Sequence, residues 1–363
     1  MTKSQTLSED LESVAQRGLP VEKYRDRTFL VTGATGLVGS LVVRNLLHLN
    51  RRFALGLHVT AVVRRIEKAY AVYEAERDDP ALSFVVWDVA EPPPESVGPV
   101  DYVVHAASVT ASREMTERPV ETIRTAVGGT ANVLALARDS GALGVVYLSS
   151  MEVYGTLPDA DGPVAEDRLG FIDLASPRSS YPEGKRMCEC LCTAYAAEYH
   201  MRISVVRLAQ TFGAGVLPGE GRVFAQFARS VIDGRDIVLR TAGLSEGNYV
   251  YAADAVAAIL LLLTEGEPGA AYNAANEESH MRIRDMAALV ADRVAEGRVR
   301  VVYDIPDDPA STGYAPDVKL FLSSARLRSL GWTPRVGLEE AYRRMIAYMR
   351  ETEAASSGSR TFS

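Results

Sequence analysis

Short, mostly apolar runs alternate with longer amphipathic stretches over more than half of the chain. The runs are five or six residues long and rich in β-branched side chains, which is typical of buried strands. They lie at residues 28–32, 58–63, 83–87, 100–105, 145–149 and 203–207. Apolar residues at helical spacing separate several of them, at residues 36–50, 69–77 and 119–140. Strands that alternate with helices in this order predict an α/β protein with a doubly wound parallel sheet.

The pattern becomes less regular after residue 213. Residues 214–247 are rich in glycine, and we expect mainly loops there. Further on, we expect helices at residues 252–263, 283–296 and 338–350 and a strand at 271–275. Together these segments predict a smaller C-terminal lobe over residues 214–350, interleaved with the main sheet. At the ends of the chain we expect a short helix or arm over residues 1–27 and a disordered tail over residues 351–363.

Composition narrows the class of protein. The chain has 363 residues, of which 47% are hydrophobic, so a large core is expected. Its formal net charge is −8 and it has no long basic run, so a nucleic-acid partner is not expected. The longest apolar run, residues 255–263, is too short to span a bilayer, and we expect no contact with a membrane. The N-terminal residues form no apolar signal segment, so we expect a cytoplasmic protein.

The cysteines and histidines do not form a metal-binding pattern. Cys188, Cys190 and Cys192 alternate along one predicted helix, which places Cys190 on a different face from the other two. This spacing suits neither a zinc site nor a disulfide framework. The five histidines are scattered along the chain, and we expect no metal.

A glycine-rich loop directly follows the first predicted strand and opens the first helix. Glycines in such a loop permit a tight turn and the approach of a pyrophosphate, and the start of the helix then supplies backbone N–H groups. The spacing is GxxGxxG, and its position between a strand and a helix predicts dinucleotide binding in a Rossmann-type domain over residues 28–213. The residues expected to contact the cofactor here are Gly33, Thr35, Gly36, Leu37, Val38 and Gly39.

Side chains at the ends of the next two strands are expected to lie near the adenosine half of the cofactor. The second strand ends at Arg64 and Arg65, where an arginine accommodates the 2′-phosphate of NADP. Stacking on the adenine or exposure to solvent is the open alternative for these arginines. Asp88 ends the third strand, where it either reaches the adenine amino group or caps the strand end.

Tyr181 and Lys185 form the most informative pair in the chain. Residues four apart on a helix share one face. An ammonium beside a phenol favours the phenolate and is expected to bring the pKa of the phenol down from its usual value of about 10. Downstream of a glycine loop, this pair predicts proton transfer next to a nicotinamide ring.

These motifs together resemble the extended short-chain dehydrogenase/reductase family, in its NAD-dependent epimerase/dehydratase group that acts on nucleotide sugars. The resemblance covers residues 28 to about 350. It is carried by Gly33–Gly39, His105–Ala107, Gly129–Asn132, Ser149–Gly155, Tyr181 with Lys185, and Leu330–Pro334. Residues 181–186 and 221–223 look most like the UDP-glucuronate decarboxylase branch.

The resemblance implies a catalytic role for four residues. Tyr181 would take a proton from a sugar hydroxyl, at C4, while hydride passes to the nicotinamide. Lys185 would hold the cofactor ribose and lower the pKa of Tyr181, and Ser150 would share a hydrogen bond with the sugar hydroxyl. Glu152 matches the carboxylate of dehydratases and decarboxylases. The alternatives are a strand-end cap for Ser150 and a merely hydrogen-bonded polar residue for Glu152.

The resemblance also implies binding residues, with four departures. It adds Val89, Ala106, Ala107 and Ser108 to the cofactor residues, and Ser149, Gln210, Arg222 and Arg240 to the substrate residues. Arg222 and Arg240 are alternatively ordinary surface charges. The departures from the family pattern are Met151 for an Asp, Gln210 for an Asn, Gly247 for a phosphate-binding Arg and Ala126 for an Asn. Met151 counts against 4,6-dehydration, and Gly247 removes a strong phosphate contact.

The expected activity is therefore that of a nucleotide-sugar epimerase that oxidises its substrate transiently with NAD(P). NAD follows from the resemblance, and NADP follows from Arg64. The alternatives are decarboxylation of a nucleotide-linked uronic acid, dehydration of the sugar, reduction of a carbonyl compound by NADPH, and a sensor or scaffold without catalysis. The resemblance further implies a homodimer, with the helix that holds Tyr181 and the helical region at 119–140 at its interface.

Overall fold

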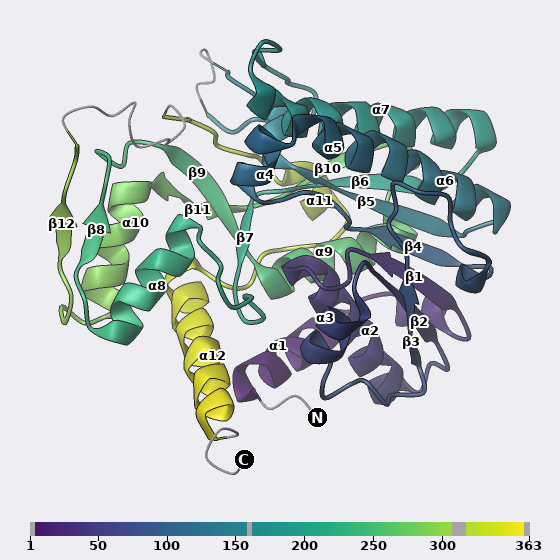
Figure 1. Ribbon diagram of the computed structural model, residues 1–363, viewed down its shortest axis with the longest axis horizontal. Coiled ribbons are helices and arrows are strands. Elements are labelled where there is room, and N and C mark those ends of the chain that lie inside the picture. The colour runs from purple at the N-terminus through teal and green to yellow at the C-terminus, as the bar shows by residue number, and fades with distance from the viewer. Residues whose placement is uncertain (1–3, 158–161, 307–316, 359–363) are drawn as a thin grey trace.

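A seven-stranded parallel sheet forms the centre of the molecule (Figure 1). The computed structural model describes residues 4–157, 162–306 and 317–358. The strand order is β10-β6-β5-β4-β1-β2-β3. The strands are β1 (Thr28–Thr32), β2 (His58–Val63), β3 (Leu82–Val86), β4 (Tyr102–His105), β5 (Gly144–Ser150), β6 (Ile203–Leu208) and β10 (Ala271–Ala274). The predicted Rossmann-type sheet is confirmed, with all seven of its predicted strands.

Helices cover both faces of this sheet. One face carries α4 (Ser112–Glu117), α5 (Pro119–Ile123), the π-helical turn η3 (Arg124–Gly128), α6 (Gly129–Asp139) and α7 (Ser180–Tyr199). The other face carries α1 (Gln5–Ala15), α2 (Leu37–Phe53), α3 (Ile66–Val72) and α9 (Ala252–Glu265). Neighbouring strand residues point to opposite faces, so Leu30 belongs to one apolar core while Phe29 and Val31 belong to the other. Burial on both faces explains why these strands are apolar throughout.

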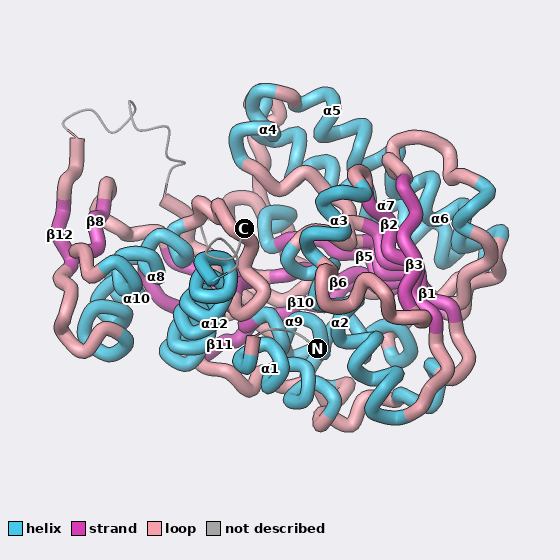
Figure 2. Tube along the Cα trace, turned by 60° about the horizontal axis from the view of Figure 1, so that its bottom comes forward, coloured by secondary structure: helices cyan, strands magenta, loops and turns pink. Residues whose placement is uncertain are grey.

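A smaller lobe lies at one end of the sheet (Figures 1 and 2). It contains the sheets β11-β9-β7 and β12-β8. Its strands are β7 (Gln210–Phe212), β8 (Ile237–Leu239), β9 (Glu246–Tyr251), β11 (Asn276–Arg282) and β12 (Val301–Tyr303). Its helices are α8 (Val223–Asp233), α10 (Ile283–Leu289) with the π-turn η6 (Val290–Val294), and α12 (Leu338–Gly358). The remaining short helices are η1 (Val21–Tyr24), η2 (Glu95–Val97), η4 (Met151–Tyr154), η5 (Pro177–Ser179) and α11 (Ala325–Ser329).

Two expectations for the C-terminal half are wrong. The segment 214–247 contains α8, which buries Phe224, Phe227 and Val231, because its apolar residues recur at helical spacing despite the glycines around them. The expected tail at 351–363 is helical as far as Gly358, while residues 359–363 lie outside the described part. The helix continues because Glu351 accepts hydrogen bonds from the hydroxyls of Ser4 and Thr6, which fixes α12 to the start of α1.

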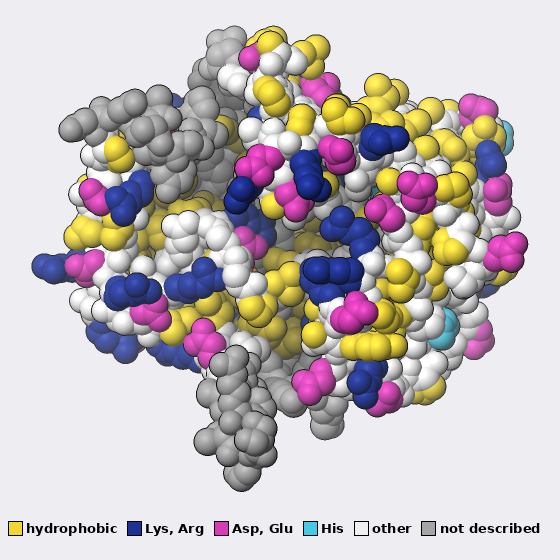
Figure 3. Space-filling model, viewed as in Figure 1, with side chains coloured by type: hydrophobic (Ala, Val, Ile, Leu, Met, Phe, Trp, Pro, Cys, Tyr) yellow, Lys and Arg dark blue, Asp and Glu magenta, His cyan; other side chains and the backbone are white. Residues whose placement is uncertain are grey.

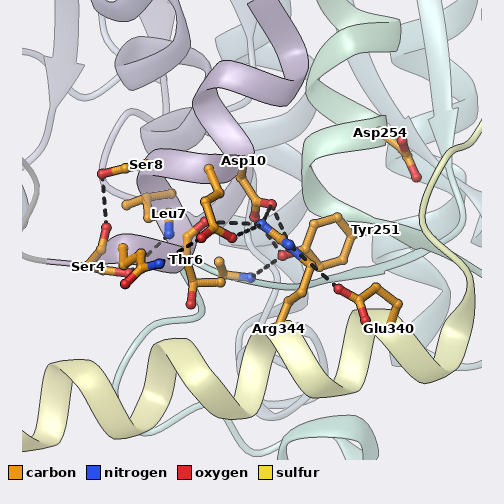
Figure 4. A network of polar contacts seen from close by, with 12 residues as sticks. Ser4, Thr6, Leu7, Ser8, Asp10, Tyr251, Asp254, Glu340 and Arg344 are labelled. Carbon is orange, nitrogen blue, oxygen red and sulfur yellow. Dashed lines mark hydrogen bonds and ion pairs between the residues drawn. The ribbon is translucent and has the colours of Figure 1, made fainter.

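The N-terminal segment is a helix built into the molecule, and not an arm that precedes it. Leu7 and Val14 of α1 belong to the main core. The Asp10 carboxylate accepts a hydrogen bond from the phenol of Tyr251, at 2.6 Å, and forms an ion pair with Arg344, at 2.8 Å (Figure 4). Helix α1 thereby joins the end of β9 to α12.

Asp254 connects the start of α9 to two distant segments. Its carboxylate, which is fully buried, forms an ion pair with Arg17 and accepts hydrogen bonds from the backbone N–H groups of Arg335 and Val336, each at 3.1 Å. Its carbonyl oxygen accepts a hydrogen bond from the indole of Trp332. Asp254 and the Leu330–Pro334 motif therefore have a structural role, since their contacts hold the start of α9 against the segment before α12.

Candidate active site

The glycine loop between β1 and α2 closes tightly against the next strand end. Gly33 has φ +64°, and a Cβ there would lie 2.6 Å from the carbonyl oxygen of Ala106. A Cβ on Gly39 would collide with the carbonyl oxygen of Gly33. Gly36 begins α2 without a side chain that caps the helix, which leaves the first N–H groups for another acceptor. The loop therefore fits a dinucleotide pyrophosphate. Thr35 lies within the loop, and Leu37 and Val38 are the first residues of α2.

The end of β4 is fixed by a buried hydrogen-bonded histidine. His105 contacts the hydroxyls of Thr32, at 2.7 Å, and Thr130, at 3.2 Å, and burial lowers its pKa to about 3. The N–H of Ala107 donates to the Thr32 hydroxyl. A neutral His105 holds the Ala106–Ser108 turn beside Gly33, at the edge where the cofactor is expected.

Asp88 and Val89 lie at the end of β3. The Asp88 carboxylate accepts a hydrogen bond from the N–H of Ala90 at 3.1 Å. Val89 is buried and lies so close to Gly129 that a Cβ there would be 2.8 Å from it. This close approach and the hydrogen bond from Asn132 to the Val89 carbonyl account for the Gly129–Asn132 motif.

Tyr181 and Lys185 lie in the first turns of α7, close to the end of β5. Lys185 is 3% exposed, and its ammonium donates a hydrogen bond to the Leu148 carbonyl at 2.6 Å. The ammonium lies 5.8 Å from the centre of the Tyr181 ring and 4.7 Å from that of Tyr147. The Ser150 hydroxyl accepts a hydrogen bond from the N–H of Glu152 at 3.2 Å and acts to lower the pKa of the Tyr181 phenol. The structure thus brings the three predicted residues together.

The electrostatics of the phenol differ from the sequence-based expectation. Burial raises the pKa of Tyr181 to about 12, and the charge of Glu152 raises it further, while the Ser150 hydroxyl and the charges of Arg178 and Arg222 oppose this. Burial also lowers the pKa of Lys185 to about 8. The phenol pKa is therefore raised in this structure and not lowered as expected, because desolvation outweighs the groups that favour the phenolate.

Glu152 faces the same site and is bound by an arginine that the motifs did not single out. One nitrogen of Arg178, Nη2, lies 3.0 Å and 2.8 Å from the two carboxylate oxygens of Glu152. The Arg178 guanidinium carbon lies 5.7 Å from the centre of the Tyr181 ring. The only sequence signal for Arg178 is its position three residues before Tyr181, within one helical turn.

A basic cleft lies beside the glycine loop. It has a volume of about 280 Å³ and is lined by Thr35, Arg64, Arg65 and Lys68. All three cations are exposed, and none of them forms an ion pair with an acid among the described residues. Lys68 is four residues after Arg64, so the sequence shows that the two are close along the chain. Only the structure shows that Lys68 lines the same cleft as Arg64 and Arg65.

The expected substrate residues do not form one cluster. Ser149 is buried and donates a hydrogen bond to Glu189, which also forms an ion pair with Arg207 at 2.7 Å, so its hydroxyl belongs to a buried network. The expected substrate role of Ser149 is not supported, because this network holds its side chain against α7.

Arg222 and Arg240 both form ion pairs. Arg222 pairs with Glu220 at 2.8 Å, and its charge acts on Tyr181. Arg240 pairs with Asp304 on the β8–β12 sheet, with 51% of its side chain exposed. Gln210 begins β7, which pairs with β9. Figure 3 shows a hollow between the smaller lobe and the main sheet, with Lys and Arg side chains along its border.

The described residues contain neither a metal-binding cluster nor a membrane-spanning helix. No three side chains of His, Cys, Asp or Glu come together there in a way that could hold a metal ion. None of the helices in residues 4–157, 162–306 and 317–358 is long and apolar enough to cross a membrane. Cys188 and Cys192 are buried and Cys190 is exposed, as the predicted helix required.

The Rossmann-type sheet, the glycine loop after β1 and the Tyr–Lys pair on α7 define an enzyme of the extended short-chain dehydrogenase/reductase class, with NAD(P) as its cofactor. The chain belongs to the NAD-dependent epimerase/dehydratase family, whose model matches residues 29–275.

Several known proteins are similar over most of the chain. UDP-glucuronic acid decarboxylase 1 of Danio rerio is 30% identical over 337 residues, which cover 92% of this chain and 75% of that protein. A dTDP-glucose 4,6-dehydratase of Streptomyces antibioticus is 28% identical, over 90% of this chain and 93% of its own length. The structure of UDP-glucose 4-epimerase from Thermotoga maritima with UDP-glucose superposes with a TM-score of 0.75 at 23% identity, over 90% of this chain and 99% of that one, which shows the shared fold.

Proposed function

We propose that this protein oxidises one carbon of a nucleotide sugar transiently and then reduces the same sugar again. The observation that carries this proposal is the meeting of Tyr181, Ser150 and Lys185 at the edge of the sheet where the glycine loop also lies. The bound dinucleotide would accept the hydride and return it. Relatives named as UDP-glucuronic acid decarboxylase and dTDP-glucose 4,6-dehydratase support a nucleotide sugar as the substrate.

The residues of the chain would move the proton. Ser150 would hold the C4 hydroxyl of the sugar, and the Tyr181 phenolate would accept its proton. The Lys185 ammonium, fixed by the Leu148 carbonyl, would hold the cofactor ribose and offset the charge of the phenolate. An oxidised nicotinamide carries a positive charge, which lowers the pKa of a nearby phenol, so a bound cofactor would oppose the desolvation of Tyr181.

The substrate would then determine the product. Return of the hydride to the opposite face of the C4 ketone gives the C4 epimer. A uronic acid with a ketone at C4 is a β-keto acid and loses CO₂ from C6, so the same residues suffice for decarboxylation. Glu152 beside the phenol and the decarboxylase relatives favour the second outcome, while Gly247 in place of an arginine counts against it. Met151 counts against dehydration.

The test is to incubate the purified protein with UDP-glucose or UDP-glucuronate, without added dinucleotide, and to follow the sugar by NMR. UDP-galactose would identify an epimerase, and CO₂ with a UDP-pentose a decarboxylase. Tyr181→Phe is expected to lower the rate by at least about 100-fold while dinucleotide binding is kept. Unchanged turnover in this variant would refute the role of Tyr181, and no conversion of either sugar would refute the proposed substrates.

A second candidate function is the reduction of a carbonyl compound by NADPH. The basic cleft of Arg64, Arg65 and Lys68 favours it, because three cations that form no ion pair within the described part of the chain suit a 2′-phosphate. Titration of the protein with NADPH and NADH by fluorescence tests the cleft, and Arg64→Ala and Lys68→Ala should each weaken NADPH binding more than NADH binding. Arg235→Ala, in an exposed ion pair of the smaller lobe, is the control. Equal affinity for both cofactors would remove this candidate.

We further propose how the chain is organised in space. Residues 28–213, with α9 and β10, would bind the cofactor, and the lobe at 214–350 would bind the substrate through Arg222, with Gln210 at its border. The proposed location is the cytoplasm, where the free cysteines would stay reduced. The proposed homodimer would use α5 and α7, which contact each other and expose Val120, Ile123 and Met187.

A further inference from the structure

The Glu152 carboxylate next to the Tyr181 phenol is not an isolated charge, because Arg178 forms an ion pair with it. Arg178 bridges both oxygens of Glu152 with one nitrogen and also lies over the Tyr181 ring, within the range of a cation–π contact. Arg178 comes from η5 and Glu152 from η4, and both elements contact α7, which holds Tyr181. Two segments thus meet at the phenol: η4, which carries Glu152, and the continuous stretch of η5 and α7, which carries Arg178 and Tyr181.

We propose that Arg178 is a positioning residue for the proton transfer of Tyr181. It fixes the Glu152 carboxylate with two hydrogen bonds and lies over the phenol ring, so that Tyr181 faces an ion pair and not an unpaired carboxylate. A phenolate beside an unpaired carboxylate is destabilised by repulsion between like charges. The ion pair offsets part of this repulsion.

The other groups that act on the phenol do not replace Arg178. Lys185 lies 5.8 Å from the ring centre, but it is bound to the Leu148 carbonyl. Arg222 reaches the site from the start of α8, but it pairs with Glu220. The Lys185 ammonium lies near the rings of both Tyr147 and Tyr181, and Tyr147, like Ser150, carries no permanent charge. Arg178 is therefore the cation that binds the Glu152 carboxylate directly and also lies over the Tyr181 ring.

The test measures the ionisation of the phenol itself. Protein labelled with ¹³C at the tyrosine Cζ is loaded with NAD⁺ and titrated from pH 8 upward, as far as circular dichroism shows the fold to be intact. The Tyr181 signal is the one that Tyr181→Phe removes. In Arg178→Gln the midpoint should move up by about one pH unit, and in Glu152→Gln it should move down by a similar amount. The double variant should lie near the native protein, and Arg178→Lys should recover part of the shift.

Arg138→Gln is the matched control. Arg138 is 37% exposed against 36% for Arg178, pairs with Asp139 at 2.8 Å and lies 5.0 Å from the Tyr199 ring, but it is on α6. It should leave the Tyr181 midpoint unchanged. The proposal is overturned if Arg178→Gln behaves like this control, or if Arg178→Gln and Glu152→Gln shift the midpoint in the same direction.

The role of Arg178 rests on Tyr181 as the proposed base. The experiments nevertheless distinguish a failure of the proposed substrate from a failure of the role of Arg178. A protein that converts no nucleotide sugar but shows the opposite shifts would keep the role of Arg178 and refute the proposed substrate. A protein that turns over a sugar but shows no shift in Arg178→Gln would refute the role of Arg178 alone.

Discussion

At the scale of the residue, Lys185 is a charge held in the interior of the protein. It is 3% exposed and has one hydrogen bond to a backbone carbonyl, and burial lowers its pKa from 10.5 to about 8. Because the folded form binds the proton less tightly than the unfolded form, the lysine destabilises the fold while both forms are charged. A shift of this size corresponds to about 3 kcal/mol.

Lys185→Met should therefore increase the free energy of unfolding of the cofactor-free protein at pH 7, by about 1–3 kcal/mol, although it removes activity. The gain should be largest below pH 8 and should shrink as the pH rises from 8 to 10.5, where the native lysine loses its proton in the fold. Urea unfolding at pH 7, 9 and 10 measures this. Lys68→Met, at an exposed position, is the control. A variant that is less stable than the native protein at pH 7 would show that the hydrogen bond to Leu148 outweighs desolvation.

At the scale of the element, the helices at the two ends of the chain are held to the sheet by buried polar contacts. Asp254, at the start of α9, binds Arg17 after α1 and the backbone before α12. Asp10 binds Arg344 on α12 and Tyr251 on β9. Removing one partner of such a buried pair leaves the other charge without compensation.

Asp254→Asn should lower the free energy of unfolding by about 3 kcal/mol, because Arg17 loses its ionised partner and an amide group then faces backbone N–H donors. Asp304→Asn is the matched control, since its partner Arg240 is half exposed, and its effect should stay below about 1 kcal/mol. Chemical denaturation of both variants measures the difference. Equal effects would show that Asp254 does not hold these segments together.

The elements also show where sequence patterns lead to correct predictions. The strands are buried on both faces, so their apolar runs marked them directly, and the glycine loop, Tyr181 and Lys185 follow from local spacing. Helix α8 was missed because its apolar face lies among glycines, and the helical end of α12 was missed because Ser4 and Thr6, which fix it, are more than 340 residues away. Arg178 was missed for a similar reason, since its partner Glu152 is 26 residues away.

At the scale of the whole molecule, the helices α5 and α7 contact each other and both expose large apolar side chains. Val120 is 61% exposed and Ile123 46% on α5, and Met187 is 51% exposed on α7. Contiguous apolar patches on a protein surface are typical of protein–protein interfaces. The proposed homodimer would cover them.

Val120→Glu combined with Met187→Glu should convert the dimer into a monomer, because two carboxylates would be buried at the interface. Light scattering coupled to size-exclusion chromatography measures the mass. Val238→Glu, at an exposed apolar position of β8, should leave the dimer intact. A native protein that is already monomeric would contradict the proposed interface.

The identity of the dinucleotide that the protein retains tests directly whether the cofactor is oxidised and reduced within one turnover. The protein is purified without added nucleotide and denatured, and the released small molecules are identified by mass spectrometry. Because the sugar is proposed to be oxidised and reduced in turn, we expect NAD or NADP in nearly equal amount to the protein. A protein that contains no dinucleotide and binds NADPH reversibly would contradict the recycled cofactor and indicate a reductase.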